Sequence, residues 1–147
     1  VENRVQGYAL ENGMRMPIEK AYDWMLGAGD IVGTVEDAYC LNKAYKNKLL
    51  LSEKIWEAIV TPSPLNKMGL GNTVYSWHGK QRINHNGGHL GFRTLHVQLP
   101  EDDFDIIILS NSGYGNARGD IAEMVYDAFY KNGEAIGESI EMDKGYV

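Results

Sequence analysis

The sequence is short of the features that would place it in several protein classes. It has one cysteine, Cys40, so it cannot form an internal disulfide, and the helical pattern around this residue predicts a buried, small apolar side chain. Acidic residues outnumber basic ones by 20 to 14, and no basic run occurs. The net charge of −6 therefore argues against a nucleic-acid or anionic-membrane partner. No apolar run approaches the roughly 20 residues that a membrane-spanning helix needs.

The first half of the chain is predicted to be helical and irregular. Residues 1–20 have mixed polarity, which indicates irregular or short-strand structure, and residues 18–26 favour a short helix or turn. Thr34 stands three residues before Asp37, as in a capping box, and apolar residues follow at helical spacing. Paired apolar residues predict a second helix over residues 52–60, which the prolines that follow would end.

The second half predicts an antiparallel meander followed by a helix. Strand-forming residues begin near Gly71, Gly79-Lys80 is the expected first turn, and three more strands follow at residues 82–86, 92–99 and 104–109. The last of these is almost entirely apolar, as expected of a central strand covered on both faces. Apolar residues at helical spacing then predict a helix over residues 121–130, with Gly133 as its C-cap.

These elements predict an α+β fold, an antiparallel β-sheet meander with a C-terminal helix packed on it and N-terminal helices. We expect residues 1–147 to form a single domain. Within it, residues 1–66 would be mainly helical or irregular, residues 67–133 would form the sheet and its helix, and residues 134–147 would be a loose tail.

One stretch combines polar side chains with glycines, and it reads His85-Asn86-Gly87-Gly88-His89-Leu90-Gly91-Phe92. The pattern indicates a strand edge that opens into a glycine-rich turn, where side chains and free backbone N–H groups can face a ligand. The same residues also fit a plain turn with a strand-end histidine that hydrogen-bonds to backbone. His85 and His89 have a spacing that brings metal ligands together on a helix but not on such a strand, so we predict no metal site.

Several motifs occur in a fixed order along the chain: Gly7-Tyr8, Ala28-Gly29-Asp30-Ile31-Val32-Gly33-Thr34-Val35-Glu36-Asp37, His85-Asn86-Gly87, Gly91-Phe92 and Leu109-Ser110-Asn111. In this order the chain resembles, from about Gly7 to Tyr130, the serine β-lactamase and penicillin-binding-protein superfamily, in particular its β-lactamase-related serine hydrolases. That superfamily carries three boxes: Ser-x-x-Lys, Tyr-x-Asn or Ser-x-Asn, and Lys-Thr-Gly or His-x-Gly. His85-Asn86-Gly87 is similar to the third box, whereas Asp30 and Gly33 depart from the branch's Ala-Gly-Gly-x-x-Ser-Thr-x-x-Asp segment.

The resemblance implies roles for five residues. His85 would line the acyl pocket as a hydrogen-bond donor near neutral pH. The backbone N–H of Gly88 would be one of two oxyanion-hole donors, each worth on the order of 3 kcal/mol of transition-state stabilisation. Asn86, Gly87 and His89 would border the substrate. No cofactor is implied.

The other two boxes are missing. None of the six serines has lysine three residues later, and every Tyr-x-Asn sequence follows the Ala28 segment, whereas the tyrosine box of the superfamily precedes it. The expectation is therefore the C-terminal portion of a longer serine hydrolase, cut after both boxes. The parent would act on amide, ester or β-lactam bonds of a small-molecule or peptide substrate through an acyl-enzyme. The chain alone would be inactive. The sequence determines no localisation, and the resemblance is compatible with an extracytoplasmic parent.

Two alternatives remain open. A non-catalytic module with a hydrolase-like cleft, binding a peptide or a cell-wall fragment, would use the same residues.

In the superfamily, strands and a helix from the N-terminal end complete the sheet, so this chain is expected to leave a sheet edge and face uncovered. Its helices over residues 52–60 and 121–130 would cover that face, or the chain would self-associate.

Overall fold

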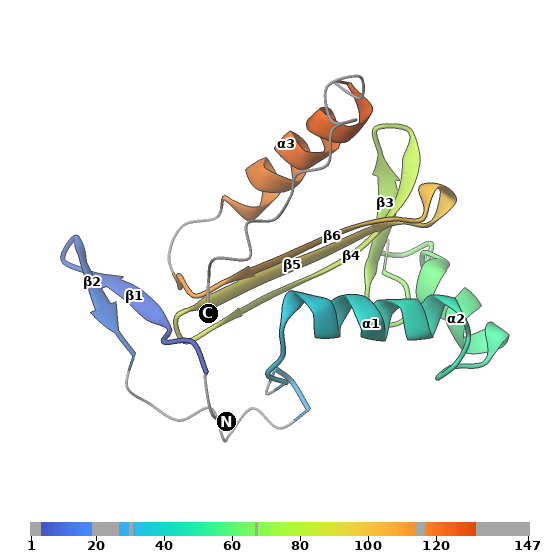
Figure 1. Ribbon diagram of the computed structural model, residues 1–147. Helices are drawn as coiled ribbons and strands as arrows, with labels where there is room; N and C mark the ends of the chain where they lie inside the picture. The colour runs from blue at the N-terminus through green and yellow to red at the C-terminus, as the bar shows by residue number, and fades with distance from the viewer. Residues whose placement is uncertain (1–3, 19–26, 30, 67, 114–116, 132–147) are drawn as a thin grey trace. The chain divides into compact units, whose positions relative to one another are not determined.

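Two antiparallel β-sheets and three α-helices make up the described part of this chain (Figure 1). The computed structural model describes residues 4–18, 27–29, 31–66, 68–113 and 117–131. Two units divide the chain, Val1–Gly115 and Asn116–Val147, and each is taken by itself. The α+β class is confirmed, and within the ranges described no helix is long and apolar enough to cross a membrane.

The larger sheet has four strands in the order β3-β4-β5-β6, so each strand pairs with the next along the chain. The predicted meander is therefore confirmed. Its strands are β3 (Thr73–Trp77), β4 (Lys80–His89), β5 (Phe92–Leu99) and β6 (Phe104–Ser110). The prediction of a central position for residues 104–109 is wrong, because β6 forms one edge of this sheet. Of the residues of β6 only Ile106 is buried, so the apolar run determined neither the burial of this strand nor the number of its neighbours.

The turns of the meander differ from the sequence prediction at two places. The first turn is His78-Gly79 and not Gly79-Lys80, because Trp77 pairs with Lys80. Both turn residues have positive φ (50° and 78°), as a type I′ hairpin turn requires. The second correction concerns the glycine pair after Asn86, which lies inside β4, while the turn to β5 is Leu90-Gly91.

All four strands of the larger sheet contribute buried apolar residues to its core. The largest fully buried side chains are those of Val74, Ile83, Val97 and Leu99. Leu95 is also buried, so the alternation predicted for residues 92–99 is confirmed. Successive strand positions point to opposite faces, and both faces of the sheet therefore contribute to the core.

Helix α1 (Val35–Lys46) begins with the predicted capping box. The Thr34 side chain accepts a hydrogen bond from the Asp37 backbone, and the Asp37 carboxylate accepts one from the Thr34 backbone. Cys40 is exposed, so the prediction that it is buried is wrong. The buried residue of α1 is the polar Asn42, because the side of the helix that contacts the sheet is polar. Helix α2 (Glu53–Val60) follows Ser52 as predicted.

A short hairpin of β1 (Tyr8–Glu11) and β2 (Met14–Pro17) lies in the segment expected to be irregular or short-stranded. Its first residue joins the end of β6. The Tyr8 N–H donates to the carbonyl of Asn111 (3.0 Å), and the Tyr8 carbonyl accepts from Gly113 (2.7 Å). The helix or turn predicted over residues 18–26, the Gly133 cap and the tail from residue 134 fall almost wholly outside the described residues.

The second unit contains α3 (Arg118–Tyr130), which confirms the predicted helix and begins three residues earlier. Its buried residues are Ala122 and Tyr126. The apolar stripe predicted for this helix is largely exposed, at Ile121, Met124, Val125 and Phe129. Apolar residues occur nearly all round α3, so spacing alone could not identify its buried side. That the helix packs on the sheet stays a prediction.

Candidate functional site

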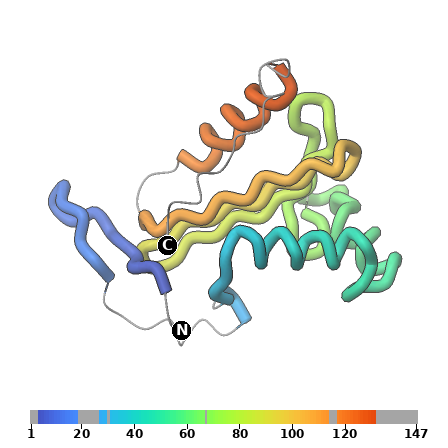
Figure 2. The backbone as a smooth tube through the Cα atoms, in the orientation of Figure 1, coloured from blue at the N-terminus to red at the C-terminus, as the bar shows by residue number. Residues whose placement is uncertain are grey.

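The five residues predicted for the site occupy the end of β4. Figure 2 shows how the strands of the larger sheet run side by side. Strand β3 pairs with β4 only as far as Asn84, whereas β5 pairs with it up to His89. From His85 to His89, β4 therefore has a strand neighbour on one side only among the residues described. His85, Asn86 and Gly88 are exposed there.

The two hairpins determine which backbone groups of β4 point toward this open edge. His89 and Phe92 close the β4–β5 hairpin, and in an antiparallel ladder hydrogen-bonded pairs alternate with non-hydrogen-bonded ones. The N–H and C=O of Asn86 and Gly88 consequently point away from β5. The β3–β4 hairpin is closed by Trp77 and Lys80, and by the same alternation the N–H and C=O of Asn84 point toward β3 and bond to it. Asn86 and Gly88 continue that row beyond the end of β3.

The side chains of the site lie on both faces of the sheet. His85 and Gly88 are three positions apart in a strand, so the His85 ring and a side chain placed at Gly88 would be on opposite faces. His85 and His89 share a face, but four strand positions separate them by about 13 Å. They cannot bind one metal ion together, and no group of three metal-ligating side chains occurs in the described ranges.

Each glycine of the pair is covered by a side chain from β5. A Cβ atom at Gly87 would collide with the Thr94 hydroxyl, and one at Gly88 would lie 3.2 Å from Nη1 of Arg93. The Arg93 guanidinium therefore lies over Gly88, where its Nη1 donates to the carbonyl of Phe92 (2.9 Å). A positive charge consequently stands beside the open edge of β4.

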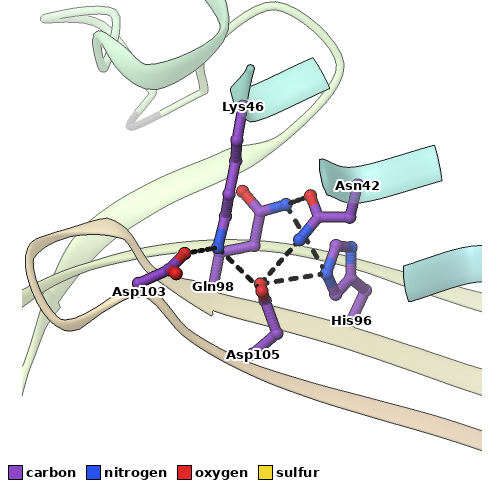
Figure 3. Close-up of polar contacts among 6 residues, drawn as sticks. All are labelled: Asn42, Lys46, His96, Gln98, Asp103 and Asp105. Carbon is purple, nitrogen blue, oxygen red and sulfur yellow. Dashed lines mark hydrogen bonds and ion pairs between the residues drawn. The ribbon is translucent and has the colours of Figure 1, made fainter. Parts of the chain in front are cut away.

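A polar cluster joins α1 to β5 and β6 in the same unit (Figure 3). Its centre is Asp105, whose side chain is only 6% exposed. One oxygen of this carboxylate accepts a hydrogen bond from Nδ2 of Asn42 (2.7 Å), and the other accepts from Nζ of Lys46 (2.7 Å). Lys46 also contacts Asp103 at 3.2 Å, and the Gln98 amide donates to Oδ1 of Asn42.

The polar cluster reaches the site through His96. Nε2 of His96 lies 3.6 Å from Oδ1 of Asp105 and 3.5 Å from Nε2 of Gln98. His96 is directly opposite His85 in the β4–β5 register, so both rings are on the face of the sheet that contacts α1. The predicted site and the polar cluster are therefore neighbours.

The charges of the polar cluster shift the pKa values of its two central groups. Burial raises the pKa of Asp105, but contacts with His96 and Lys46 outweigh burial and hold the pKa of this carboxyl below its usual value. Burial lowers the pKa of Lys46, but Asp105, with Asp103, outweighs it and raises the pKa of the ammonium. Both groups are therefore charged at neutral pH.

The sequence contained signals for the polar cluster that were not used in predicting the site. Asp105 interrupts an otherwise apolar strand, and a charge at such a position needs a partner. His96 and Gln98 alternate with buried apolar residues, which places them on one face of β5. Asn42 and Lys46 are four apart and share one side of α1. These residues of β6, β5 and α1 come together only when α1 packs against the sheet.

Comparison of the chain with protein-family models, with curated proteins and with solved structures finds no match. The resemblance given above therefore depends on the ordered motifs alone.

Proposed function

We propose that this chain is the C-terminal part of a serine hydrolase of the β-lactamase and penicillin-binding-protein type, acting on amide, ester or β-lactam bonds through an acyl-enzyme. The observation that carries the proposal is the open strand edge at Asn86, within the His-x-Gly sequence, and at Gly88, directly after it. Backbone N–H groups at such an edge can stabilise the oxyanion that develops when an acyl carbonyl is attacked.

Each residue at the edge has a part in this proposal. The Gly88 N–H donates to the carbonyl oxygen of the substrate. Gly87, which has no Cβ atom, leaves room for the Thr94 hydroxyl next to it. His85 donates a hydrogen bond within the acyl pocket. Arg93 adds a positive charge that suits a substrate with an anionic group. The nucleophilic serine and its lysine would come from sequence outside these 147 residues.

A second candidate function is a binding module that catalyses nothing. An open strand edge can pair with an extended peptide, and such β-augmentation needs backbone hydrogen bonds but no nucleophile. The absence of Ser-x-x-Lys from the sequence favours this alternative if the chain acts alone.

The coding sequence upstream of Val1 provides the first test. The hydrolase proposal expects a Ser-x-x-Lys box followed by a Tyr-x-Asn box there. The longer protein should then hydrolyse a chromogenic cephalosporin or a p-nitrophenyl ester and form an acyl-enzyme that intact-mass measurement detects. His85→Ala should lower kcat/KM by about 100-fold, which corresponds to the roughly 3 kcal/mol that a hydrogen bond to a charged group can contribute. His78→Asn is the matched control, because His78 lies in the β3–β4 turn with positive φ, which asparagine tolerates.

The 147-residue chain provides the second test. Without a nucleophile it should hydrolyse neither compound beyond a histidine-catalysed background, and benzylpenicillin should add no mass to it. Acylation of one serine in stoichiometric amount would contradict this expectation. Reversible shifts of the Asn86 and Gly88 amide signals with an extended peptide, but not with benzylpenicillin, would instead favour the binding module.

A further inference from the structure

Asparagine is followed by glycine at three places in the sequence, at residues 12–13, 86–87 and 132–133, and the last of these lies outside the described residues. In such a pair the backbone nitrogen of the glycine can attack the side-chain carbonyl carbon of the asparagine, because glycine has no side chain to hinder it. The attack requires a nitrogen that is accessible and not bound in a hydrogen-bonded ladder. The two described pairs differ in this respect.

The first pair, Asn12-Gly13, is the two-residue turn between β1 and β2. Glu11 pairs with Met14 on either side of it, and both turn residues have positive φ (51° and 78°), as in a type I′ turn. Both are exposed, and a Cβ atom placed at Gly13 would meet nothing within 4 Å. Across the part of the chain that the structure describes, no hydrogen bond engages the Gly13 N–H. Its nitrogen is therefore accessible.

The strands beside this turn do little to hold it closed. β1 and β2 form a sheet of two strands with 4 residues each, and none of these residues is buried. A hairpin of this kind is only marginally stable in water, so it opens locally far more often than the protein unfolds. The hydrogen bonds from Tyr8 to Asn111 and Gly113 hold the end of the hairpin that is distant from the turn.

The second pair, Asn86-Gly87, lies inside the four-stranded sheet. Gly87 pairs with Thr94 of β5, and the alternation of the antiparallel ladder directs the Gly87 N–H toward that strand. The Thr94 hydroxyl also covers this glycine. The Gly87 nitrogen could attack only after β4 and β5 had separated here. Although Asn86 is exposed, the fold therefore protects its amide.

We propose that Asn12 is a site of spontaneous deamidation and that the sheet protects Asn86 from the same reaction. The Gly13 nitrogen loses its proton to a base from the solvent and bonds to Cγ of Asn12, and the side-chain nitrogen leaves as ammonia. Water then opens the resulting succinimide ring. If the bond from the ring nitrogen to Cγ breaks, the product is an aspartate. If the bond to the backbone carbonyl carbon breaks, the product is an isoaspartate, in which the β-carbon has become part of the backbone.

The experiment follows both amides by peptide mapping of the 147-residue chain, incubated at mildly alkaline pH in buffer and, separately, in concentrated urea. In buffer, Asn12 should lose its amide at least about tenfold faster than Asn86, because the short hairpin opens more often than the β4–β5 ladder. In urea the ladder is absent, and the two asparagines should react at similar rates. Equal rates in buffer, or an Asn12 that keeps its amide longer than Asn86, would overturn the inference.

The products have a control of their own. Asn12→Asp introduces the same charge with a normal backbone, and aspartate tolerates the left-handed conformation. This variant should leave the backbone amide signals of Glu11 and Met14 nearly unchanged. The isoaspartate product should shift them, because its longer backbone does not fit a two-residue turn. If the incubated chain gained neither product while both asparagines reacted in urea, Asn12 would be protected by the hairpin and the proposal would be refuted.

Discussion

Asp103 and Asp105 contact the same ammonium group in very different surroundings. The Asp105 side chain is 6% exposed and lies 2.7 Å from Nζ of Lys46, whereas that of Asp103 is 87% exposed and lies 3.2 Å from it. Water screens the exposed pair, so it contributes little to stability. The buried carboxylate has exchanged its water for Asn42, Lys46 and His96, and removing it leaves these donors without their acceptor.

Replacement by asparagine should therefore change the free energy of unfolding by unequal amounts at the two positions. Asp105→Asn should lower the free energy of unfolding by about 2 kcal/mol, the usual loss for hydrogen bonds to a charged group. Asp103→Asn should lower it by less than about 0.5 kcal/mol. Urea unfolding of the protein and both variants at neutral pH measures the difference. Equal losses would mean that burial of Asp105 has no energetic consequence.

The same carboxylate predicts that the protein loses stability at acid pH. The folded-state pKa of Asp105 is below its unfolded value of about 3.9, so its contribution is present in full above that value and is lost as pH falls through the folded pKa. The stability gap between the protein and Asp105→Asn should shrink as pH falls from 5 toward 2. Urea titrations across this range test the sign, and a gap that widens on acidification would contradict it. The pKa of Lys46 is raised in the fold, so the stability that its ammonium contributes is lost as pH rises through this folded-state pKa.

At the scale of elements, two turn glycines have the same backbone requirement and different surroundings. Gly79 (φ 78°) and Gly91 (φ 84°) both adopt the left-handed conformation. A Cβ atom at Gly79 would have nothing within 4 Å, whereas one at Gly91 would lie 2.6 Å from the backbone nitrogen of Tyr8. Gly91 therefore also allows the first strand of the chain to approach the β4–β5 turn.

This difference predicts the cost of alanine at each turn. Gly79→Ala should lower the free energy of unfolding by about 1 kcal/mol, the strain of a left-handed alanine. Gly91→Ala should cost at least about 2 kcal/mol more, because backbone atoms must move apart. It should also weaken the hydrogen bond from Tyr8 to Asn111, which amide hydrogen exchange at Tyr8 would report. Similar losses for the two variants would show that the close approach at Gly91 is easily relieved.

At the scale of the whole molecule, the apolar edge strand β6 is the feature with the largest consequence. Along the described residues, no strand pairs with the outer side of β6 between Asp105 and Leu109, and Leu109 is 42% exposed. This strand contains no proline and no lysine, two of the usual devices against edge-to-edge pairing, and its one charged residue is the inward-pointing Asp105. The expectation that the chain self-associates through an uncovered sheet edge stays a prediction.

We accordingly expect the chain to self-associate through β6. The sedimentation coefficient should rise with protein concentration, and Leu109→Lys should shift the chain toward the monomer, because a charge on an edge strand opposes pairing. Leu65→Lys is the matched control, since Leu65 is 93% exposed in a turn outside the sheet. A monomer at all concentrations, or equal effects of both lysines, would refute association through this edge.

The sequence by itself determined the α+β class, the order of the meander strands, the alternation within β5 and the capping box at Thr34. These features depend on neighbours along the chain: a side chain that caps its own helix, apolar residues that alternate within one strand, and turn residues between strands. Such local interactions join residues that are close together in the sequence, so they can be predicted from the sequence alone.

Only the tertiary structure decided the edge position of β6, the place of the glycine pair inside β4 and the polar cluster around Asp105. Each depends on residues distant in the sequence, such as Asn42 and Asp105, which are 63 positions apart. An apolar strand does not specify how many strands flank it, and a buried aspartate does not specify which helix supplies its cation. The free energy of such contacts arises when separate elements pack together, because only then does water leave the charges between them.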